Sequence, residues 1–281
     1  MINYVKSKYC EKPDLILRST KNSNLLAIGH AFIELQSVDS TNNYAMAQAT
    51  GGTAPHGTLF FAYDQWAGKG QRGRTWTSTP GENIVLSAVL EPVALKPSQA
   101  FALSVCVALA CHDLFSRYAG PESTFIKWPN DLYWNDRKAG GILIENHFQG
   151  DRWPLAIAGM GININQVEFP ATARNPVSLR QITGRPFQAV DLARELGSCL
   201  DQRYSALVGE NGLPHAAGTS AQLEEYNARL YRRGQAVRLK KENAVFETVV
   251  QGVSAQGQLL TRDVLEREFA FGEVEWIIPM P

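Results

Sequence analysis

Residues 98–118 form a stretch that is apolar on nearly every side when it is drawn as a helix. Such a helix has no polar face to turn toward water, so other elements have to cover it all round. Short apolar segments that are typical of buried strands lie on both sides of it, at 58–64, 83–89, 124–128 and 155–163. The sequence therefore predicts a well-buried helix beside a β-sheet, in an α+β fold.

The amino-acid composition of the chain disfavours several classes of function. The 281 residues suffice for one large domain and a small one. Because 27 Lys and Arg balance 27 Asp and Glu, nothing favours a general binder of nucleic acid or membrane surfaces. No apolar run approaches the roughly 18 residues of a membrane helix, and the first ten residues lack a secretory signature. The four scattered cysteines fit a reducing cytoplasm.

Further elements are expected from local patterns. They are a strand at 32–36, a short helix that ends near residue 49, a hairpin of 131–134 with 138–145, and helices at 189–207 and 221–230. Four period-two segments follow at 235–239, 245–250, 257–261 and 268–271. Four or five short strands in so few residues predict a small β-barrel. We expect an N-terminal extension over 1–31, a main domain over 32–230 and the barrel over 231–281.

The segment Ala67–Trp76 contains three glycines and three cations but no acid, and it connects two predicted strands. Glycines permit a close approach of the backbone to a ligand, and the cations add charge that a fold alone does not require. Such a loop is suited to cradling phosphate, although exposed connections also have this composition. It matches neither the P-loop pattern nor the position of a dinucleotide fingerprint, so a classical dinucleotide fold is not expected.

Five segments occur in the order found in biotin–protein ligases, a family that the chain resembles over roughly residues 32–280. They are Ser40–Asn42, Gln65–Trp76, Lys127–Leu132, Asp136–Glu145 and Gly159–Asn163. The resemblance implies that 32–230 is a catalytic domain related to class II aminoacyl-tRNA synthetases and lipoate ligases. It also implies that 231–281 is an SH3-like barrel.

The reaction that the resemblance implies has two steps. Biotin and Mg-ATP give biotinyl-5′-AMP and pyrophosphate, and a lysine of a biotin carboxyl carrier domain then takes the biotinyl group. We expect a cytoplasmic ligase of the monofunctional bacterial type without a DNA-binding role, because 31 residues are too few for the N-terminal DNA-binding domain of some bacterial members. The sequence leaves open the carrier and the oligomeric state, a homodimer included.

The biotin-binding residues that the resemblance implies are Ser40, Thr41, Asn42, Gln65, Gly68, Lys69, Gly70, Gln71, Lys138 and Gly141. Small hydroxyl and amide groups are suited to the ureido oxygen and N–H groups of biotin. The alternative for Ser40 or Thr41 is a plain helix N-cap, and both roles are compatible.

The adenylate-binding residues implied by the resemblance are Arg72, Arg74, Trp76, Asn130, Gly161 and Asn163, and the catalytic ones are Lys138, Lys127, Asp131 and Arg72. A carboxylate has to approach a highly anionic nucleotide, so fixed cations and Mg²⁺ should supply most of the catalysis. By the family pattern Lys138 binds the biotin carboxylate and the reacting phosphate. Asp131 is a candidate to position or deprotonate the acceptor amine.

Alternatives remain for the catalytic residues. On sequence alone Lys138 is equally an exposed hairpin lysine, and the alternative for Lys127 and Asp131 is a structural ion pair. No metal ligands are assigned. The loop at 168–179 is a weaker candidate to cover the adenine.

Lys69 and Gln71 stand where many family members have arginine. Lysine keeps the charge but loses the planar fork, and glutamine loses the charge, so we expect retention of the adenylate to rely on Arg72 and Arg74. Two rival functions are a lipoate or octanoyl transferase on the same scaffold and a non-catalytic module that senses biotin or docks a carrier. Retention of Lys127, Asp131 and Lys138 argues against the second.

Overall fold

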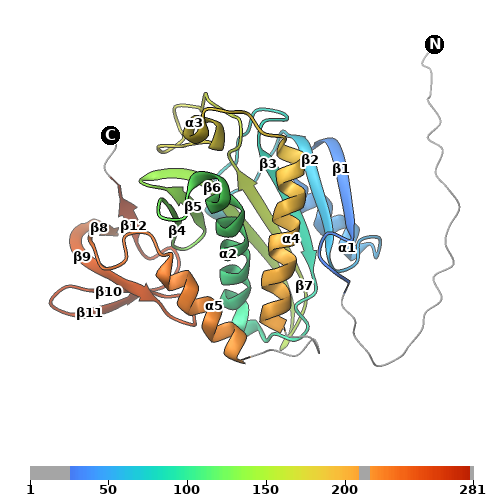
Figure 1. The fold of residues 1–281 in the computed structure, drawn as a ribbon. Coiled ribbons are helices and arrows are strands. Elements are labelled where there is room, and N and C mark those ends of the chain that lie inside the picture. The colour runs from blue at the N-terminus through green and yellow to red at the C-terminus, as the bar shows by residue number, and fades with distance from the viewer. Residues whose placement is uncertain (1–25, 209–215, 279–281) are drawn as a thin grey trace, which may run out of the picture.

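The computed structural model describes residues 26–208 and 216–278. Its main body is a seven-stranded sheet with long helices packed against one face, and a smaller sheet lies to one side (Figure 1). The predicted α+β architecture is confirmed. The predicted extension over 1–31 lies largely outside the described residues, and so does most of the connection at 209–218.

The large sheet contains every strand that the sequence predicts in the main domain. Its strands are β1 Ala31–Val38, β2 Thr58–Gln65, β3 Ile84–Leu90, β4 Thr124–Lys127, β5 Asp131–Trp134, β6 Arg137–Gln149 and β7 Arg152–Ile162. They are ordered β1-β2-β3-β7-β6-β5-β4, and neighbours pair antiparallel except β1 and β2. The parallel pair brings the carboxyl ends of both strands to one edge, where Val38 pairs with Gln65.

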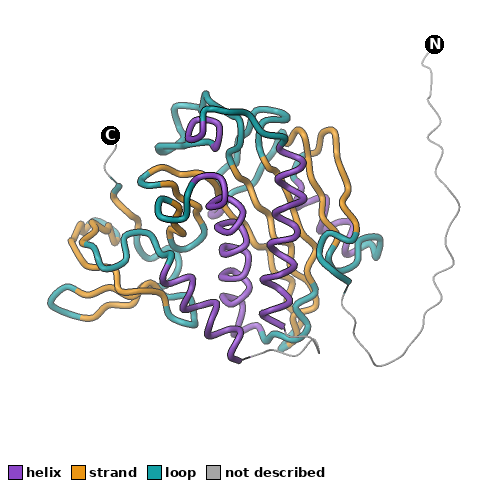
Figure 2. Tube along the Cα trace, in the orientation of Figure 1, coloured by secondary structure: helices purple, strands orange, loops and turns teal. Residues whose placement is uncertain are grey.

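Helices α2, Ala100–Ala119, and α4, Ala189–Val208, lie side by side against the large sheet (Figure 2). The shorter helices are α1 Thr41–Thr50, α3 Leu179–Thr183 and α5 Ala216–Ala228, with single 3₁₀ turns η1 Gln71–Gly73 and η2 Pro97–Gln99. Leu103, Leu109 and Phe115 of α2 are fully buried in the core. The helix is thus covered on most sides, as its sequence predicts.

One expectation about α2 is wrong. The segment Pro97–Ala119 is long and apolar enough to cross a membrane by length and composition alone, although no apolar run of that length was expected. Most of the segment is buried against other elements of the protein, which is the setting of a core helix.

The smaller sheet has five short antiparallel strands, in agreement with the four or five predicted. They are β8 Ala236–Lys241, β9 Ala244–Val253, β10 Leu259–Arg262, β11 Glu266–Phe269 and β12 Glu275–Ile277, in the order β11-β10-β9-β8-β12. Backbone bonds connect Ile126 of β4 to Arg229 and Tyr231 just before this sheet. The indole Nε1 of Trp128 donates to the carbonyl of Gly257 at 2.9 Å. The small sheet is therefore held against the segment that follows β4.

Candidate active site

A buried network of hydroxyl and amide groups lies where the first two strands end. The Oε1 of Gln65 accepts from the backbone N of Thr41 at 2.8 Å and from its hydroxyl at 3.2 Å. The Ser87 hydroxyl lies 2.8 Å from that of Thr41 and donates to Asn42 Oδ1 at 2.6 Å. The amide of Asn42 donates to Glu145 Oε2 at 2.8 Å. Three residues predicted to bind biotin are thus brought together.

Ser40 takes the role of helix N-cap, the alternative that the sequence had left open. It is buried, and its side chain accepts from the backbone N of Asn43. Ser87 was not predicted for the site. Its signal in the sequence is a single hydroxyl within the apolar run Ile84–Leu90, where a buried polar group needs partners.

Three glycines on β6 and β7 place no side chains on the face of the sheet that lies beside this network. Gly141 pairs with Gly161, and Leu143 pairs with Gly159. A Cβ added to Gly159 would lie 2.3 Å from Asn42 Oδ1, and one on Gly161 would lie 2.5 Å from Trp76 Cε2. We call Gly141, Gly159 and Gly161 the glycine floor. Only glycine lets the Asn42 amide and the Trp76 indole approach the backbone this closely.

Trp76 therefore ends the cationic loop against the glycine floor. Its indole Nε1 is buried and has no hydrogen-bond partner within the part of the chain that the structure describes. A buried indole N–H normally finds an acceptor. This donor is therefore left unpaired beside the glycine floor.

The cationic loop folds back on itself as a small hairpin. Gly70 N donates to Arg74 O at 2.7 Å, and Trp76 N donates to Gly68 O at 2.9 Å. Lys69 donates to Asn43 Oδ1 and lies 3.7 Å from Glu145 Oε1, so its charge is next to the buried polar network.

The tip of the loop reaches the small sheet. Arg72 has a left-handed backbone with φ 57°, a conformation that costs a non-glycine residue free energy. Its guanidinium donates to the carbonyl of Gly272 at 3.3 Å. Arg74 is exposed, and its charge acts on Lys127 and Glu275. Arg72 thus connects the tip of the loop to the small sheet.

Two lysines share one carboxylate at the β4–β5–β6 end of the site. Asp131 Oδ1 lies 2.6 Å from Lys138 Nζ, and Asp131 Oδ2 lies 3.7 Å from Lys127 Nζ. The ion pair of Lys127 with Asp131, which the sequence left as an alternative, is therefore present. Lys138 belongs to the same cluster and is not a freely exposed hairpin lysine. We call these three residues the lysine–aspartate cluster.

Lys127 is only 8% exposed. Burial lowers its pKa, while the charge of Asp131 acts in the opposite direction. Its ammonium lies 5.4 Å from the ring centre of Tyr133 and 5.3 Å from that of Trp276. A carboxylate and two π faces thus stabilise the buried charge.

The loop at 168–178 runs beside Lys138. Lys138 N donates to Asn175 O at 2.8 Å, and Val177 N donates to Lys138 O at 2.9 Å. The buried amide of Asn163 donates to Val177 O at 3.1 Å. Asn163, predicted for the adenylate, therefore also has a structural role in holding this loop.

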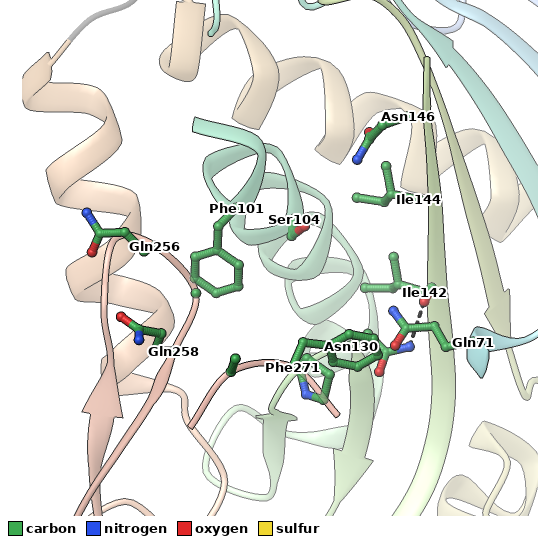
Figure 3. Close-up of a pocket in the computed structure, with 13 residues that line it drawn as sticks. Gln71, Phe101, Ser104, Asn130, Ile142, Ile144, Asn146, Gln256, Gln258 and Phe271 are labelled. Atoms are coloured by element: carbon green, nitrogen blue, oxygen red, sulfur yellow. Dashed lines mark hydrogen bonds between the residues drawn. The ribbon is translucent and has the colours of Figure 1, made fainter. Parts of the chain in front are cut away.

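A cavity of about 310 Å³ opens between α2, β6 and two turns of the small sheet (Figure 3). Gln71 and Asn130 line it, and the Asn130 amide donates to Ile142 O at 2.7 Å. Gln71 was predicted to bind biotin. It lines this cavity and, among the residues that the structure describes, makes no hydrogen bond to the buried polar network that contains Gln65. Phe101 and Phe271 form apolar walls of the cavity.

The arrangement suits a ligand that has a polar uncharged head and an anionic end. The polar network offers paired donors and acceptors, and Lys69, Lys138 and Arg74 offer positive charge. Within residues 26–208 and 216–278, no three His, Cys, Asp or Glu side chains gather as a metal site would require. Asp131 and Glu145 are each ion-paired with lysine.

Comparison with known proteins agrees with this class of site. The sequence profile of the biotin/lipoate A/B protein ligase family matches residues 34–163. The biotin–[acetyl-CoA-carboxylase] ligase of Paracoccus denitrificans is 31% identical over 252 residues, which cover 83% of this chain and 95% of that protein. The chain belongs to the biotin/lipoate A/B protein ligase family.

Other relatives are longer. The bifunctional ligase/repressor BirA of Bacillus spizizenii is 34% identical over 173 residues, and that of Bacillus subtilis is 35% identical over 155 residues. The matches cover 60% and 54% of this chain, and the chain spans about half the length of these two relatives, 52% and 47%. A biotin protein ligase from Aquifex aeolicus, solved in complex with biotin and ATP, has a TM-score of 0.72 and 22% identity. The comparison covers 89% of this chain and 100% of that one, and it shows the shared fold.

Proposed function

We propose that this protein activates biotin with ATP to biotinyl-5′-AMP and transfers the biotinyl group to a lysine of a biotin carboxyl carrier domain. The observation that carries the proposal is the lysine–aspartate cluster, in which one carboxylate bridges two lysines. The name of the Paracoccus relative, a biotin–[acetyl-CoA-carboxylase] ligase, supports the same reaction.

In the first step a biotin carboxylate oxygen attacks the α-phosphorus of ATP. The bond between this phosphorus and the oxygen that bridges the α- and β-phosphates breaks, and pyrophosphate leaves. Before this attack Lys138 exchanges Asp131 for the biotin carboxylate and the reacting phosphate, because both are anions that need its charge. Arg72 and Arg74 stabilise the adenylate phosphate. Mg²⁺ enters as part of the Mg-ATP substrate and neutralises phosphate charge there, since it commonly keeps substrate phosphates among its ligands.

In the second step the acceptor amine attacks the acyl carbon of the mixed anhydride, and AMP leaves. The amine has to lose a proton first. Asp131 has a carboxylate oxygen to accept it once Lys138 has turned toward the substrate. Lys127 keeps the second oxygen of Asp131 in place throughout.

The polar network favours biotin over lipoate. A ureido group has a carbonyl oxygen and two N–H groups, which Thr41, Asn42 and Ser87 match with hydroxyl and amide groups. The dithiolane ring of lipoate has neither a carbonyl nor an N–H, so it would gain no hydrogen bond from these groups, whereas the ureido group would.

We also infer that the small sheet is an SH3-like barrel and that the large sheet is related to class II aminoacyl-tRNA synthetases. Five short antiparallel strands with a register shift between Leu260 and Thr261 support the first inference. The proposed domains are 32–230 and 231–281. Three buried free thiols, Cys106, Cys111 and Cys199, support a cytoplasmic location.

The test is biotinylation of a purified carboxyl carrier domain, followed as a mass increase on its acceptor lysine. The proposal expects modification that needs ATP and biotin and that excess lipoate leaves unchanged. Lipoylation in place of biotinylation would favour the transferase alternative. Tight biotin binding without modification would favour a sensing module.

A further inference from the structure

Trp276 of β12 belongs to the small sheet, but its ring centre lies 5.3 Å from Lys127 Nζ in the large sheet. Trp276 is itself buried and packs against Tyr231, with ring centres 5.9 Å apart. Tyr231 in turn contacts Tyr133, the second ring beside the ammonium, at 5.1 Å. Three aromatic residues thus form one connected wall around Lys127.

The indole N–H does not account for this placement. The Nε1 of Trp276 is buried and is without a hydrogen-bond partner among residues 26–208 and 216–278. A buried unpaired donor costs free energy that phenylalanine or leucine would avoid. What the indole supplies at this position is its π face, which attracts a cation better than any other ring does.

Lys127 connects this wall to the reacting groups. It lies 3.7 Å from one oxygen of Asp131, and the other oxygen lies 2.6 Å from Lys138. The charged groups that act on Lys127 are Asp131, Lys138 and Arg74. Two of these three are cations that repel it, so it is held in place by Asp131 and the rings.

We propose that Trp276 is a positioning residue of the active site, which fixes Lys127 so that Lys127 keeps Asp131 aligned for the acceptor amine. The inference rests on the proposed function. It assigns to the small sheet a direct part in the transfer step, through one side chain that touches the cluster.

The test compares Trp276→Leu, Trp276→Phe and the control Phe269→Leu. Leucine keeps apolar volume but removes the π face, whereas phenylalanine restores a face. Phe269 is a buried ring of the same small sheet that lies 5.6 Å from Lys241, so its replacement removes the same kind of contact away from the site. Each variant is assayed for biotin-dependent ATP–pyrophosphate exchange and for single-turnover transfer to a carrier domain.

We expect Trp276→Leu to slow transfer by about three- to tenfold, the range of one partly buried cation–π contact. The carrier concentration at half-maximal rate should stay unchanged, because Trp276 acts on the rate and not on docking. Trp276→Phe should restore most of the rate, and Phe269→Leu should transfer like the wild type.

Wild-type transfer by Trp276→Leu, or an equal loss in Phe269→Leu, would overturn the inference while leaving the proposed function intact. A wild-type protein that shows neither exchange nor transfer would overturn the proposed function, and this inference with it.

Discussion

Asp131 places its two carboxylate oxygens against two different lysines, at 2.6 Å from Lys138 and 3.7 Å from Lys127. At the scale of single residues, this sharing lets one lysine change its partner while the other stays paired with Asp131. Lys138 is part-exposed and can exchange Asp131 for a substrate anion, whereas Lys127 is buried and keeps its position. One lysine is thus suited to binding and the other to holding the carboxylate.

A residue outside the site makes stability depend on pH. Burial lowers the pKa of His56 from 6.5 to about 4, and its neutral Nδ1 accepts from Glu91 N at 3.0 Å. The unfolded chain therefore binds this proton more tightly than the folded one does. The contribution of neutral His56 to the free energy of unfolding is fully present above pH 6.5. It falls by about 3 kcal/mol as the pH decreases from 6.5 toward 4.

Urea denaturation at several pH values checks this prediction. His56→Asn keeps an acceptor for Glu91 N but removes the titration, so its free energy of unfolding should fall less in that window. Equal pH dependence in the wild type and the variant would contradict the assignment to His56.

The three residues of the lysine–aspartate cluster were predicted from the sequence. That both lysines pair with the same carboxylate was not predicted. Lys127 pairs with Asp131 across the β4–β5 turn, and a register shift between Leu132 and Tyr133 sets Lys138 opposite Tyr133. Such an irregularity depends on how β5 packs against β6. The residue spacing carries no signal for it.

At the scale of elements, Arg203 connects three helices. Its guanidinium on α4 donates to Asp113 of α2 at 2.6 and 2.8 Å and to Glu225 of α5 at 2.5 and 2.8 Å. Hydrogen bonds to the two carboxylates raise the pKa of Arg203. Helices α2, α4 and α5 are therefore connected to each other by these ion pairs.

Arg203→Met should destabilise the protein by about 3 kcal/mol, because it leaves two partly buried carboxylates without their cation. Urea denaturation measures the loss. Lys241→Ala, which breaks the exposed pair with Glu273, is the control and should cost about 0–1 kcal/mol. Similar losses in both variants would show that the helix connection contributes little.

Most of the elements were predictable because they have strong local patterns, whereas α3 and β12 were not predicted, and α5 spans Ala216–Ala228 instead of the expected 221–230. The apolar run at 98–118 indicates α2, and alternation indicates the strands. The lengths of β6 and β7 were not predicted, since they extend beyond 138–145 and 155–163 into exposed polar ends such as His147 and Arg152. Nor does local pattern fix the strand order, which depends on contacts between distant segments.

At the scale of the whole molecule, the small sheet contacts the site and the segments around it at several places. Arg72 donates to Gly272, Trp128 donates to Gly257, and Trp276 lies beside Lys127. The position of the cationic loop therefore depends on a sheet that is distant in sequence.

Arg72→Ala should speed dissociation of biotinyl-5′-AMP by roughly tenfold, the equivalent of one hydrogen bond from a charged group. Gln71→Arg should slow it, because it adds a cation to the loop. Arg233→Ala, which removes a similar guanidinium–carbonyl bond to Gln251 away from the loop, is the control. Release is followed after rapid dilution of the preformed complex. Unchanged release from Arg72→Ala would contradict this role of the arginine.

Biotin-dependent ATP–pyrophosphate exchange by the wild type and by Lys138→Ala tests the proposed role of the lysine–aspartate cluster most directly. We expect exchange that requires biotin in the wild type and a loss of at least about a hundredfold in Lys138→Ala, since the variant removes the cation that we propose for both reacting anions. Lys241→Ala should exchange like the wild type. Wild-type exchange in Lys138→Ala would contradict the role given to the lysine–aspartate cluster.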